Sequence, residues 1–251
     1  MSKYFIFILL VLSSCAEFSD VFEVSPSHTV EGKGVYYTVK EGDTVVSIAD
    51  QYAVSVQSIM ETNNLLEAAS LEVGSTLFIP GVAPQEPVRT AKREKVTKVR
   101  ETVPVTTAPV IVVERDENRF IWPVDGIVTS RYGVRRKRQH DGIDISAPRG
   151  TPVKAAAKGK VVYAKKMSGY GNLIVIKHSG NFFTAYAHLS EYKTKVGDRV
   201  AQGDLIGLVG STGRSSGPHC HFEVRHNAES RNPLFFLPKK EIRDSDEVIN
   251  D

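Results

Sequence analysis

The chain has 251 residues, of which 41% are hydrophobic and 24% charged, with 19 glycines and 12 prolines. This composition is ordinary for a soluble globular protein and excludes collagen-like, wholly disordered and polytopic membrane proteins. The 32 basic and 29 acidic residues give a formal net charge of +3, which is too small to indicate a nucleic-acid-binding protein. The length suffices for one large domain or two smaller ones, each with a hydrophobic core.

The first segment, residues 1–14, has the pattern of a secretory signal peptide. Lys3 precedes an apolar run over residues 4–12, which is shorter than the roughly 20 residues that a mature membrane-spanning helix needs. Residues 12–15 (Leu-Ser-Ser-Cys) resemble a bacterial lipobox, and this resemblance implies that Cys15 is lipidated and becomes the new N-terminus. We therefore expect an exported lipoprotein that the lipid anchors to the cell envelope, at the periplasmic face of the outer membrane if the organism is Gram-negative.

Residues 15–34 are polar and irregular and are expected to form a short tether that leads into a small module over residues 35–80. Alternating apolar residues predict strands at both ends of the module, and apolar residues at helical spacing predict two helices between them. Residues that can cap a helix precede each helix. The expected elements are a strand through Tyr37 and Val39, a helix from Val45 to Tyr52 after Asp43 and Thr44, a helix after Ser55, and a strand over residues 77–79 that ends at Pro80.

This module resembles the LysM peptidoglycan-binding domain. The match consists of Y-x-V-x-x-G-D-T, I-A-x-x-Y, a central Asn and G-x-x-L-x-I-P, in that order from Tyr37 to Pro80. Acetamido groups offer amide donors and acceptors that exposed backbone and asparagine can meet. Asp43 and Thr44 can also act only as helix caps, and Asn63 only as a helix stop. The resemblance implies that N-acetylglucosamine-containing glycan strands of peptidoglycan bind beside Gly42, Asp43 and Thr44 and beside the turn at Asn63 and Asn64.

A linker over residues 81–118 separates this module from the rest of the chain. It contains four prolines, runs of Thr and Val, and few aromatic residues, which is typical of an extended, semi-rigid segment. Between residues 89 and 100, basic side chains greatly outnumber the single acid, Glu94. A solvated linker that extends by self-repulsion is favoured over one that contacts an anionic polymer or a membrane surface.

The region over residues 119–237 is rich in short alternating apolar runs that glycine-containing turns separate. It has no long helical period, so the pattern predicts an antiparallel β-sheet domain. A charged tail over residues 238–251 follows. The expected fold class is therefore a two-domain protein, with a small β-α-α-β LysM-like module and a mainly antiparallel β-sheet domain.

Two short motifs in this region carry side chains that bind metal ions. Because side chains alternate between the faces of an extended segment, residues two apart share a face. Two histidines and one aspartate suit Zn²⁺, and three protein ligands leave a fourth position for water. The residues that share a face are His140, Gly142 and Asp144 in the first motif, and His219, His221 and Glu223 in the second.

Each motif has another interpretation when it is taken alone. His140 and Asp144 could form a simple ion pair on a helix, and the histidines of the second motif could be a pair on the surface of a strand. Glu223 could orient a metal ligand or form a surface ion pair with Arg225. The basic run over residues 135–138 could meet carboxylates of a substrate or be a solvated loop.

Together with Tyr-Gly-Asn at residues 170–172 and Tyr-Ala-His-Leu-Ser at residues 186–190, these motifs resemble the lysostaphin/LytM family of zinc endopeptidases, in the same order along the chain. Zinc in such a site activates water, while one histidine accepts a proton and another donates to the oxyanion. Which histidine takes which part stays open. The resemblance implies that His140, Asp144 and His221 hold Zn²⁺ and that His188 and His219 are the catalytic pair.

The expected function is hydrolysis of peptide cross-links between the stem peptides of peptidoglycan by a zinc metallo-endopeptidase that the LysM-like module holds at the glycan strands. The alternative is not an enzyme. Lipoproteins of the NlpD kind share this layout, but many have lost zinc ligands and activate N-acetylmuramoyl-L-alanine amidases in cell division, so an amidase or a regulatory protein is the alternative partner. The complete set of five side chains favours catalysis.

Overall fold

The computed structural model describes residues 34–67, 71–82, 116, 118–135 and 138–239. These residues belong to two compact units, a small one within residues 34–82 and a large one within residues 116–239. No helix in these ranges has the length and apolar character that a membrane span requires. The expected signal peptide, Cys15, nearly all of the tether and most of the linker and charged tail lie outside the described residues, and the domain boundaries stay predictions.

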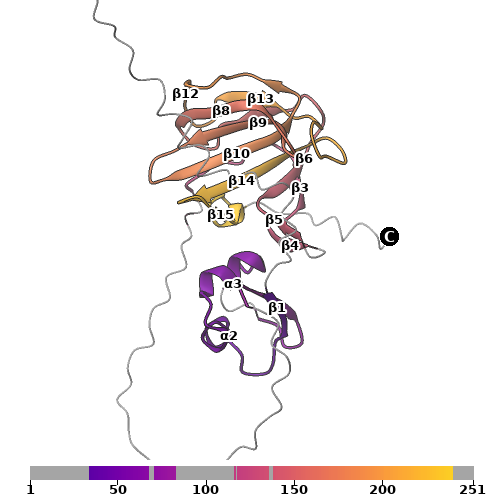
Figure 1. The fold of residues 1–251 in the computed structure, drawn as a ribbon, viewed down its shortest axis with the longest axis vertical. Coiled ribbons are helices and arrows are strands. Elements are labelled where there is room, and N and C mark those ends of the chain that lie inside the picture. Colours follow the sequence, from indigo (N-terminus) through magenta and orange to yellow (C-terminus); the bar gives the residue numbers. More distant parts are fainter. Residues whose placement is uncertain (1–33, 68–70, 83–115, 117, 136–137, 240–251) are drawn as a thin grey trace, which may run out of the picture. The chain divides into compact units, whose positions relative to one another are not determined.

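The small unit has the β-α-α-β order that the sequence predicts (Figure 1). Its two strands pair antiparallel, and its second helix packs against the second strand and the first helix. Ile48, Ile59 and Ile79 are fully buried and form part of its core. The elements are β1 (Gly34–Thr38), α2 (Val45–Tyr52), α3 (Val56–Thr62) and β2 (Thr76–Pro80).

The two helices begin where the sequence places their caps. Thr44 and Ser55 cap α2 and α3, and the hydroxyl of each accepts a hydrogen bond from the backbone N–H three residues further on, at 3.0 Å. Asp43, the other cap candidate, does not cap a helix through its carboxylate. That carboxylate instead accepts hydrogen bonds from the Tyr37 hydroxyl and the Lys40 backbone N–H, both at 2.7 Å. Asp43 therefore shapes the loop before α2.

Antiparallel strands make up the large unit, as its alternating apolar runs predict. The strands are β3 (Ile127–Ser130), β4 (Gly133–Arg135), β5 (Arg138–His140), β6 (Ile143–Ser146), β7 (Pro152–Lys154), β8 (Gly159–Met167), β9 (Gly171–Lys177), β10 (Phe182–Leu189), β11 (Glu191–Tyr192), β12 (Arg199–Val200), β13 (Leu205–Leu208), β14 (His219–His226) and β15 (Glu229–Arg231), and the 3-10 helix η1 (Pro233–Phe235) follows. The predicted class, a small β-α-α-β module and a mainly antiparallel β domain, is confirmed.

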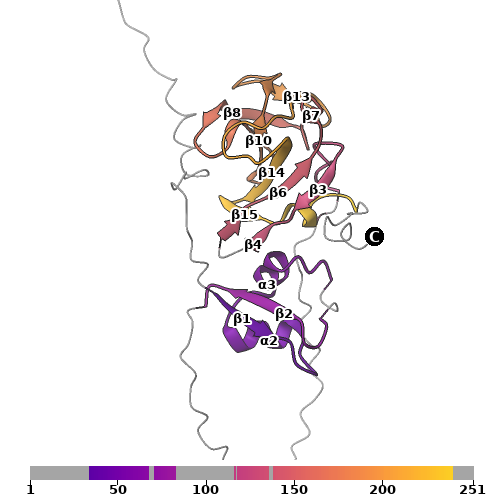
Figure 2. The ribbon, with the colours of Figure 1, turned by 90° about the vertical axis from the view of Figure 1, so that its right-hand side faces the viewer.

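The main sheet of the large unit has the order β12-β8-β9-β10-β14-β6-β3, with β15 also paired to β14 (Figures 1 and 2). A three-stranded sheet, β11-β13-β7, and the β4-β5 hairpin complete the unit. All residues of β10 are buried, and β9 is buried over most of its length. The centre of the sheet is therefore a rigid base for side chains at the ends of β6, β10 and β14.

The register of the central strands places three chemically important residues side by side. His221 on β14 lies opposite Asp144 on β6 and opposite Ala187 on β10, the residue before His188. Cys220 and Phe222, on either side of His221, have no exposed surface, so they pack in the core as the alternation predicts. Burial of a side chain such as Phe222 contributes about 1.5–3 kcal/mol, which helps to hold this register.

Candidate metal centre

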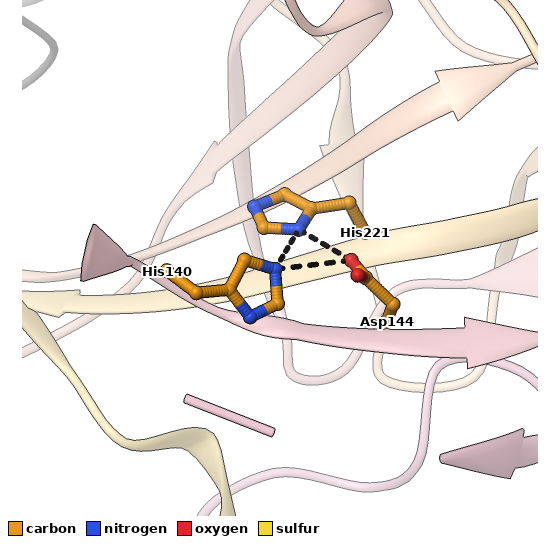
Figure 3. Close-up of side chains that lie close together, drawn as sticks. All are labelled: His140, Asp144 and His221. Carbon is orange, nitrogen blue, oxygen red and sulfur yellow. Dashed lines mark hydrogen bonds and ion pairs between the residues drawn. The ribbon is translucent and has the colours of Figure 1, made fainter. Parts of the chain in front are cut away.

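Three side chains converge at one end of the main sheet (Figure 3). The Nδ1 of His221 lies 2.8 Å from Asp144 Oδ1 and 3.1 Å from His140 Nε2, and His140 Nε2 lies 3.2 Å from Asp144 Oδ1. The side chains of His140, Asp144 and His221 are only 14%, 21% and 9% exposed. Three potential ligand atoms therefore face one another in a partly shielded position.

The backbone brings His140 to this cluster in a way that the sequence did not indicate. The prediction that residues 140–144 form one extended segment was wrong, because β5 ends at His140 and β6 begins only at Ile143. At Gly142 the chain passes so close to β14 that an added Cβ would lie 2.3 Å from the carbonyl oxygen of Phe222. The absence of a side chain at Gly142 therefore permits the close approach that places His140 next to Asp144.

Backbone and side-chain acceptors fix the tautomers of the two histidines in the cluster. The carbonyl oxygen of Arg131 accepts a hydrogen bond from His140 Nδ1–H at 2.7 Å, which leaves the Nε2 lone pair directed at the cluster. A carboxylate oxygen of Glu223 accepts one from His221 Nε2–H at 3.0 Å, which leaves Nδ1 directed at the cluster. Two ring lone pairs and a carboxylate at this spacing repel unless they share a positive charge. This donor set fits Zn²⁺.

Glu223 forms the ion pair with Arg225 that one interpretation of the sequence offered, but the pair is buried rather than at the surface, and the orienting role also fits. Its side chain is 1% exposed. Besides His221, it accepts hydrogen bonds from the Tyr170 hydroxyl at 2.7 Å and from Arg225 Nε at 2.9 Å. Burial acts to raise the pKa of Glu223, but the charge of Arg225 and the hydrogen bond from His221 outweigh burial and lower it to about 2. Glu223 is thus an anion that holds the ring of His221.

The cluster itself favours positive charge. Burial acts to raise the pKa of the Asp144 carboxyl. In the absence of a metal ion, hydrogen bonds that His140 and His221 donate when the ring nitrogen facing Asp144 is protonated outweigh burial and hold that pKa well below its usual range. Burial acts to lower the pKa of His221, but Asp144 and Glu223 outweigh it and raise the pKa to about 9. Two carboxylates therefore stabilise a cation at this position, which is either a proton or a metal ion.

His188 and His219 lie beside the cluster, with their ring centroids 4.7 Å apart. The Nδ1–H of His188 donates to the carbonyl oxygen of Thr212 at 2.7 Å, and that of His219 donates to the carbonyl oxygen of Gly217 at 2.8 Å. Each ring therefore keeps its Nε2 as an acceptor. Burial and the neighbouring histidines His221 and His219 lower the pKa of His188 to about 4, so that His188 is neutral near pH 7.

The backbone of His188 has a left-handed conformation, with φ of 59°. The register of β9 and β10 shifts at this point, between Tyr186 and Leu189. A non-glycine residue in this region is uncommon, and such strain gathers at functional sites. Two backbone hydrogen bonds hold this conformation of His188. Its N–H donates to the carbonyl oxygen of Tyr170 at 2.8 Å, and its carbonyl oxygen accepts from the N–H of Thr212 at 3.3 Å.

A cleft with a volume of about 930 Å³ contains all five of these side chains. Tyr170, Glu223 and the loop before β14 also line it. The structure thus brings together His140, Asp144, His221, His188 and His219, the five residues that the sequence singled out. It adds the carbonyl groups of Arg131 and Thr212, which sequence reasoning missed because a carbonyl carries no signal of residue type. It also gives Tyr170, part of the motif at residues 170–172, a contact with Glu223 that the sequence did not indicate.

The residues predicted to bind glycan lie in two loops of the small unit. Gly42 has a φ of 84° and precedes Asp43 and Thr44, whose side chains make the loop and cap contacts described above. The Asn63 amide donates to the carbonyl oxygens of Ile59 and Phe78 at 2.8 and 2.7 Å, and its oxygen accepts from Phe78 N–H at 2.7 Å. Asn63 therefore ties α3 to β2. Asn64 has a φ of 56°. Contact of these residues with glycan stays a prediction.

Comparison with known proteins agrees with this two-part organisation. Residues 37–80 match the LysM domain, and residues 138–233 match Peptidase family M23. The lipoprotein YgeR of Escherichia coli (strain K12) is 37% identical over 214 residues, which cover 84% of each chain. The chain therefore belongs to the family of proteins in which a LysM domain precedes an M23 peptidase domain, and the resemblances to the LysM domain and to the lysostaphin/LytM peptidases are confirmed.

Two further relatives differ from each other in what their names describe. The DD-carboxypeptidase/endopeptidase Mpg of Neisseria meningitidis serogroup B is 46% identical over 128 residues, which cover 48% of this chain and 30% of Mpg. The murein hydrolase activator NlpD of Salmonella typhimurium is 30% identical over 263 residues, which cover 82% of this chain and 69% of NlpD. The relatives of this chain thus include a named peptidase and a named activator.

Proposed function

We propose that this protein is a zinc-dependent endopeptidase that hydrolyses peptide cross-links of peptidoglycan. The convergence of two histidine lone pairs and a carboxylate, with two further histidines in the same cleft, carries the proposal. A protein that only binds or activates others has no need for ligand tautomers that are fixed in this way. The similarity to Mpg, a named DD-carboxypeptidase/endopeptidase, supports the same reaction class.

His140 Nε2, Asp144 Oδ1 and His221 Nδ1 would hold the zinc ion. When bound, zinc supplies Lewis acidity, which polarises a carbonyl group and makes water more acidic. Glu223 keeps the Nδ1 of His221 available as a ligand by accepting a hydrogen bond from its Nε2–H. The register of β14 and β6 holds His221 and Asp144 at a fixed separation, so that little reorganisation accompanies the reaction.

The second pair of histidines would move the protons. Because the Nδ1–H of both His188 and His219 is engaged with a carbonyl group, Nε2 is the ring atom that can accept a proton or donate one. One of the two accepts a proton at Nε2 and returns it to the leaving amine. The other, in the form that is protonated at Nε2 as well as Nδ1, donates a hydrogen bond to the developing oxyanion. The low pKa of His188 keeps this ring neutral, as a base must be before the reaction.

The rest of the chain would hold this domain at its substrate. The LysM domain binds glycan strands through the loops at Gly42–Thr44 and Asn63–Asn64, and the lipid on Cys15 anchors the chain to the envelope membrane, at the outer membrane in a Gram-negative cell. YgeR, a lipoprotein that aligns with 84% of the chain, supports this placement. The linker then lets the peptidase domain reach stem peptides near the bound glycan.

A second function has its own support. NlpD, a murein hydrolase activator, aligns with 82% of this chain, so activation of an N-acetylmuramoyl-L-alanine amidase is the alternative. The two functions differ in what they require of the cleft. Catalysis requires all three metal ligands, whereas activation of another enzyme requires only the surface that this enzyme binds.

A digest of purified peptidoglycan tests the proposal. The zinc-loaded protein is compared with a chelated sample, with His221→Ala and with His226→Ala as a histidine control at the far end of β14, and the muropeptides are separated and weighed. We expect cross-linked dimers to disappear with the wild type and His226→Ala only. Intact cross-links in the presence of folded, zinc-bound protein would overturn the proposal, and addition of an amidase would then test activation.

A further inference from the structure

The cleft that holds the metal cluster is also lined by two arginines. Arg138 lies on β5, two residues before His140, and Arg214 lies in the loop that leads to His219. The backbone N–H of Arg214 donates to the carbonyl oxygen of Gly169 at 2.8 Å, which fixes the position of this loop on the cleft. Both arginine residues are exposed. Two cations are therefore available to a molecule that enters the cleft.

The acidic residues that line the same cleft are engaged elsewhere. Asp144 belongs to the metal cluster, and Glu223 is buried against Arg225, His221 and Tyr170. Asp141 accepts a hydrogen bond from the Ser230 hydroxyl at 3.2 Å. Within the described parts of the chain, no ion pair or side-chain hydrogen bond involves Arg138 or Arg214.

Arg138 lies near the metal cluster, so its charge is available to a group next to the scissile amide. Because residues two apart share a face of a strand, Arg138 and His140 project from the same face of β5, and about 7 Å of extended chain separates them. A long arginine side chain therefore reaches a group close to an amide that is bound at the metal cluster. The planar guanidinium forms paired hydrogen bonds with a carboxylate, and exposed arginines do so with a small desolvation penalty.

We propose that Arg138 and Arg214 form a carboxylate-binding subsite, which selects peptides that carry a free carboxylate next to the scissile amide. This inference rests on the proposed peptidase function and names its substrate class. Conversion of the carboxylate to a carboxamide removes the charge and half of the acceptor atoms, so an amidated peptide loses the contact. The subsite therefore distinguishes substrates by the chemical state of one group.

The test uses the zinc-loaded, full-length protein with two cross-linked peptides that differ only in carboxylate or carboxamide next to the scissile bond. We expect the carboxylate peptide to have a roughly 10-fold higher kcat/KM, because charge-assisted hydrogen bonds at an exposed position lie at the weak end of their range. Most of the difference should appear in KM, since the contact is made equally in the ground and transition states. High salt should reduce the preference.

Substitutions of the two arginines test whether they cause the preference for the carboxylate peptide. In Arg138→Gln and Arg214→Gln the carboxylate peptide should become a poorer substrate while the carboxamide peptide is unchanged, and in the double variant both peptides should react equally. Arg149→Gln, at an exposed position outside the lining of the cleft, is the matched control and should keep the full preference.

The outcomes separate the two proposals. If the wild type hydrolyses both peptides equally well, the subsite is wrong and the endopeptidase function stands. If the wild type hydrolyses neither peptide, the endopeptidase function is wrong, and calorimetric binding of the same two peptides then decides the subsite. Tighter binding of the carboxylate peptide that the double variant abolishes supports the subsite, and equal affinities overturn it.

Discussion

In the small unit, the polar side chains of the sequence motif make contacts within the fold. Thr44 caps a helix, Asp43 closes a loop against Tyr37 and Lys40, and Asn63 uses its amide to join α3 to β2. In the large unit, the motif side chains face a common cleft, and their remaining ring atoms point toward one another. The fold of the large unit is held by other groups, mainly the buried apolar residues of β9 and β10.

This difference teaches how a motif can be interpreted. A motif whose polar groups are satisfied internally identifies a fold, and the surface that binds a ligand must then be formed by neighbouring backbone and side chains. A motif whose polar groups are directed at one another, with their other atoms held by orienting partners, identifies chemistry. Substitutions should therefore affect stability in the small unit and zinc binding or activity at the cleft.

The largest effect is expected for His221→Ala in the large unit. This substitution removes one of three metal ligands and one of the hydrogen-bond partners of buried Glu223. Bound zinc and peptide hydrolysis should therefore fall to background, while the small unit is unaffected. Metal content by mass spectrometry and muropeptide analysis measure both effects. Full zinc occupancy in folded His221→Ala would show that the cluster is not the metal site, and His226→Ala is the histidine control.

A smaller effect on the same site is expected for Glu223→Gln. The amide keeps the size of the side chain but weakens the acceptor that orients His221, so zinc affinity should fall about 10- to 100-fold. Competition with a chromophoric chelator measures this affinity. Tyr170→Phe, which removes one hydrogen bond to Glu223, should give a weaker shift in the same direction, and exposed Glu229→Gln should give none. Unchanged affinity in Glu223→Gln would contradict the orienting role.

His178 tests whether a histidine of the large unit can have a purely structural role. It is buried, with Nδ1 2.8 Å from the Lys158 carbonyl oxygen and Nε2 2.8 Å from Thr184 Oγ1, and burial lowers its pKa from 6.5 to about 4. Between these values the unfolded chain binds the proton and the folded chain does not, so the free energy of unfolding decreases as the pH falls from 6.5 to 4.

The size of this contribution is on the order of 3 kcal/mol at the acid end of that range. Urea unfolding at several pH values should show that His178→Gln lacks this part of the pH dependence while its hydrolytic activity at neutral pH is kept. Parallel pH profiles for the wild type and His178→Gln would disprove the assignment.

The smallest of these effects is expected in the small unit, for Asn63→Ala. The substitution removes two hydrogen bonds from the Asn63 side chain to the Phe78 backbone on β2 and a third to the Ile59 carbonyl within α3, at a cost of about 2 kcal/mol. A shift in the unfolding midpoint of the small unit, with unchanged zinc content, is the expected result. Exposed Gln51→Ala should change the midpoint little. An unaltered midpoint in Asn63→Ala would mean that the amide is not needed for the fold.

Local patterns were sufficient to predict much of this molecule. The order of elements in the small unit and the antiparallel β class of the large unit follow from apolar periodicity, and the caps Thr44 and Ser55 follow from residue type, because all of these depend on neighbours in sequence. The break between β5 and β6 did not follow, because it depends on how closely Gly142 approaches β14. The burial of Glu223 and the left-handed backbone of His188 likewise depend on strands that are distant in sequence.

The candidate cleft shows the same limit. Residue types and spacing pointed to His140, Asp144 and His221, but the tautomers that make their lone pairs converge depend on the Arg131 carbonyl and on Glu223. No periodicity in the sequence places Arg131 beside His140. The sequence therefore indicates which side chains act, and tertiary contacts determine which of their atoms do so.

The alternation along β14 also has a consequence for folding fidelity. A slip of this strand by one residue would turn Cys220 and Phe222 toward the cleft and bury the imidazole rings of His219 and His221 in the apolar interior. Such a misregistered sheet would lose burial of a large aromatic side chain and would present a thiol where the metal ligand belongs. Apolar packing on one face of β14 thus selects the register that places His219 and His221 in the cleft on the opposite face.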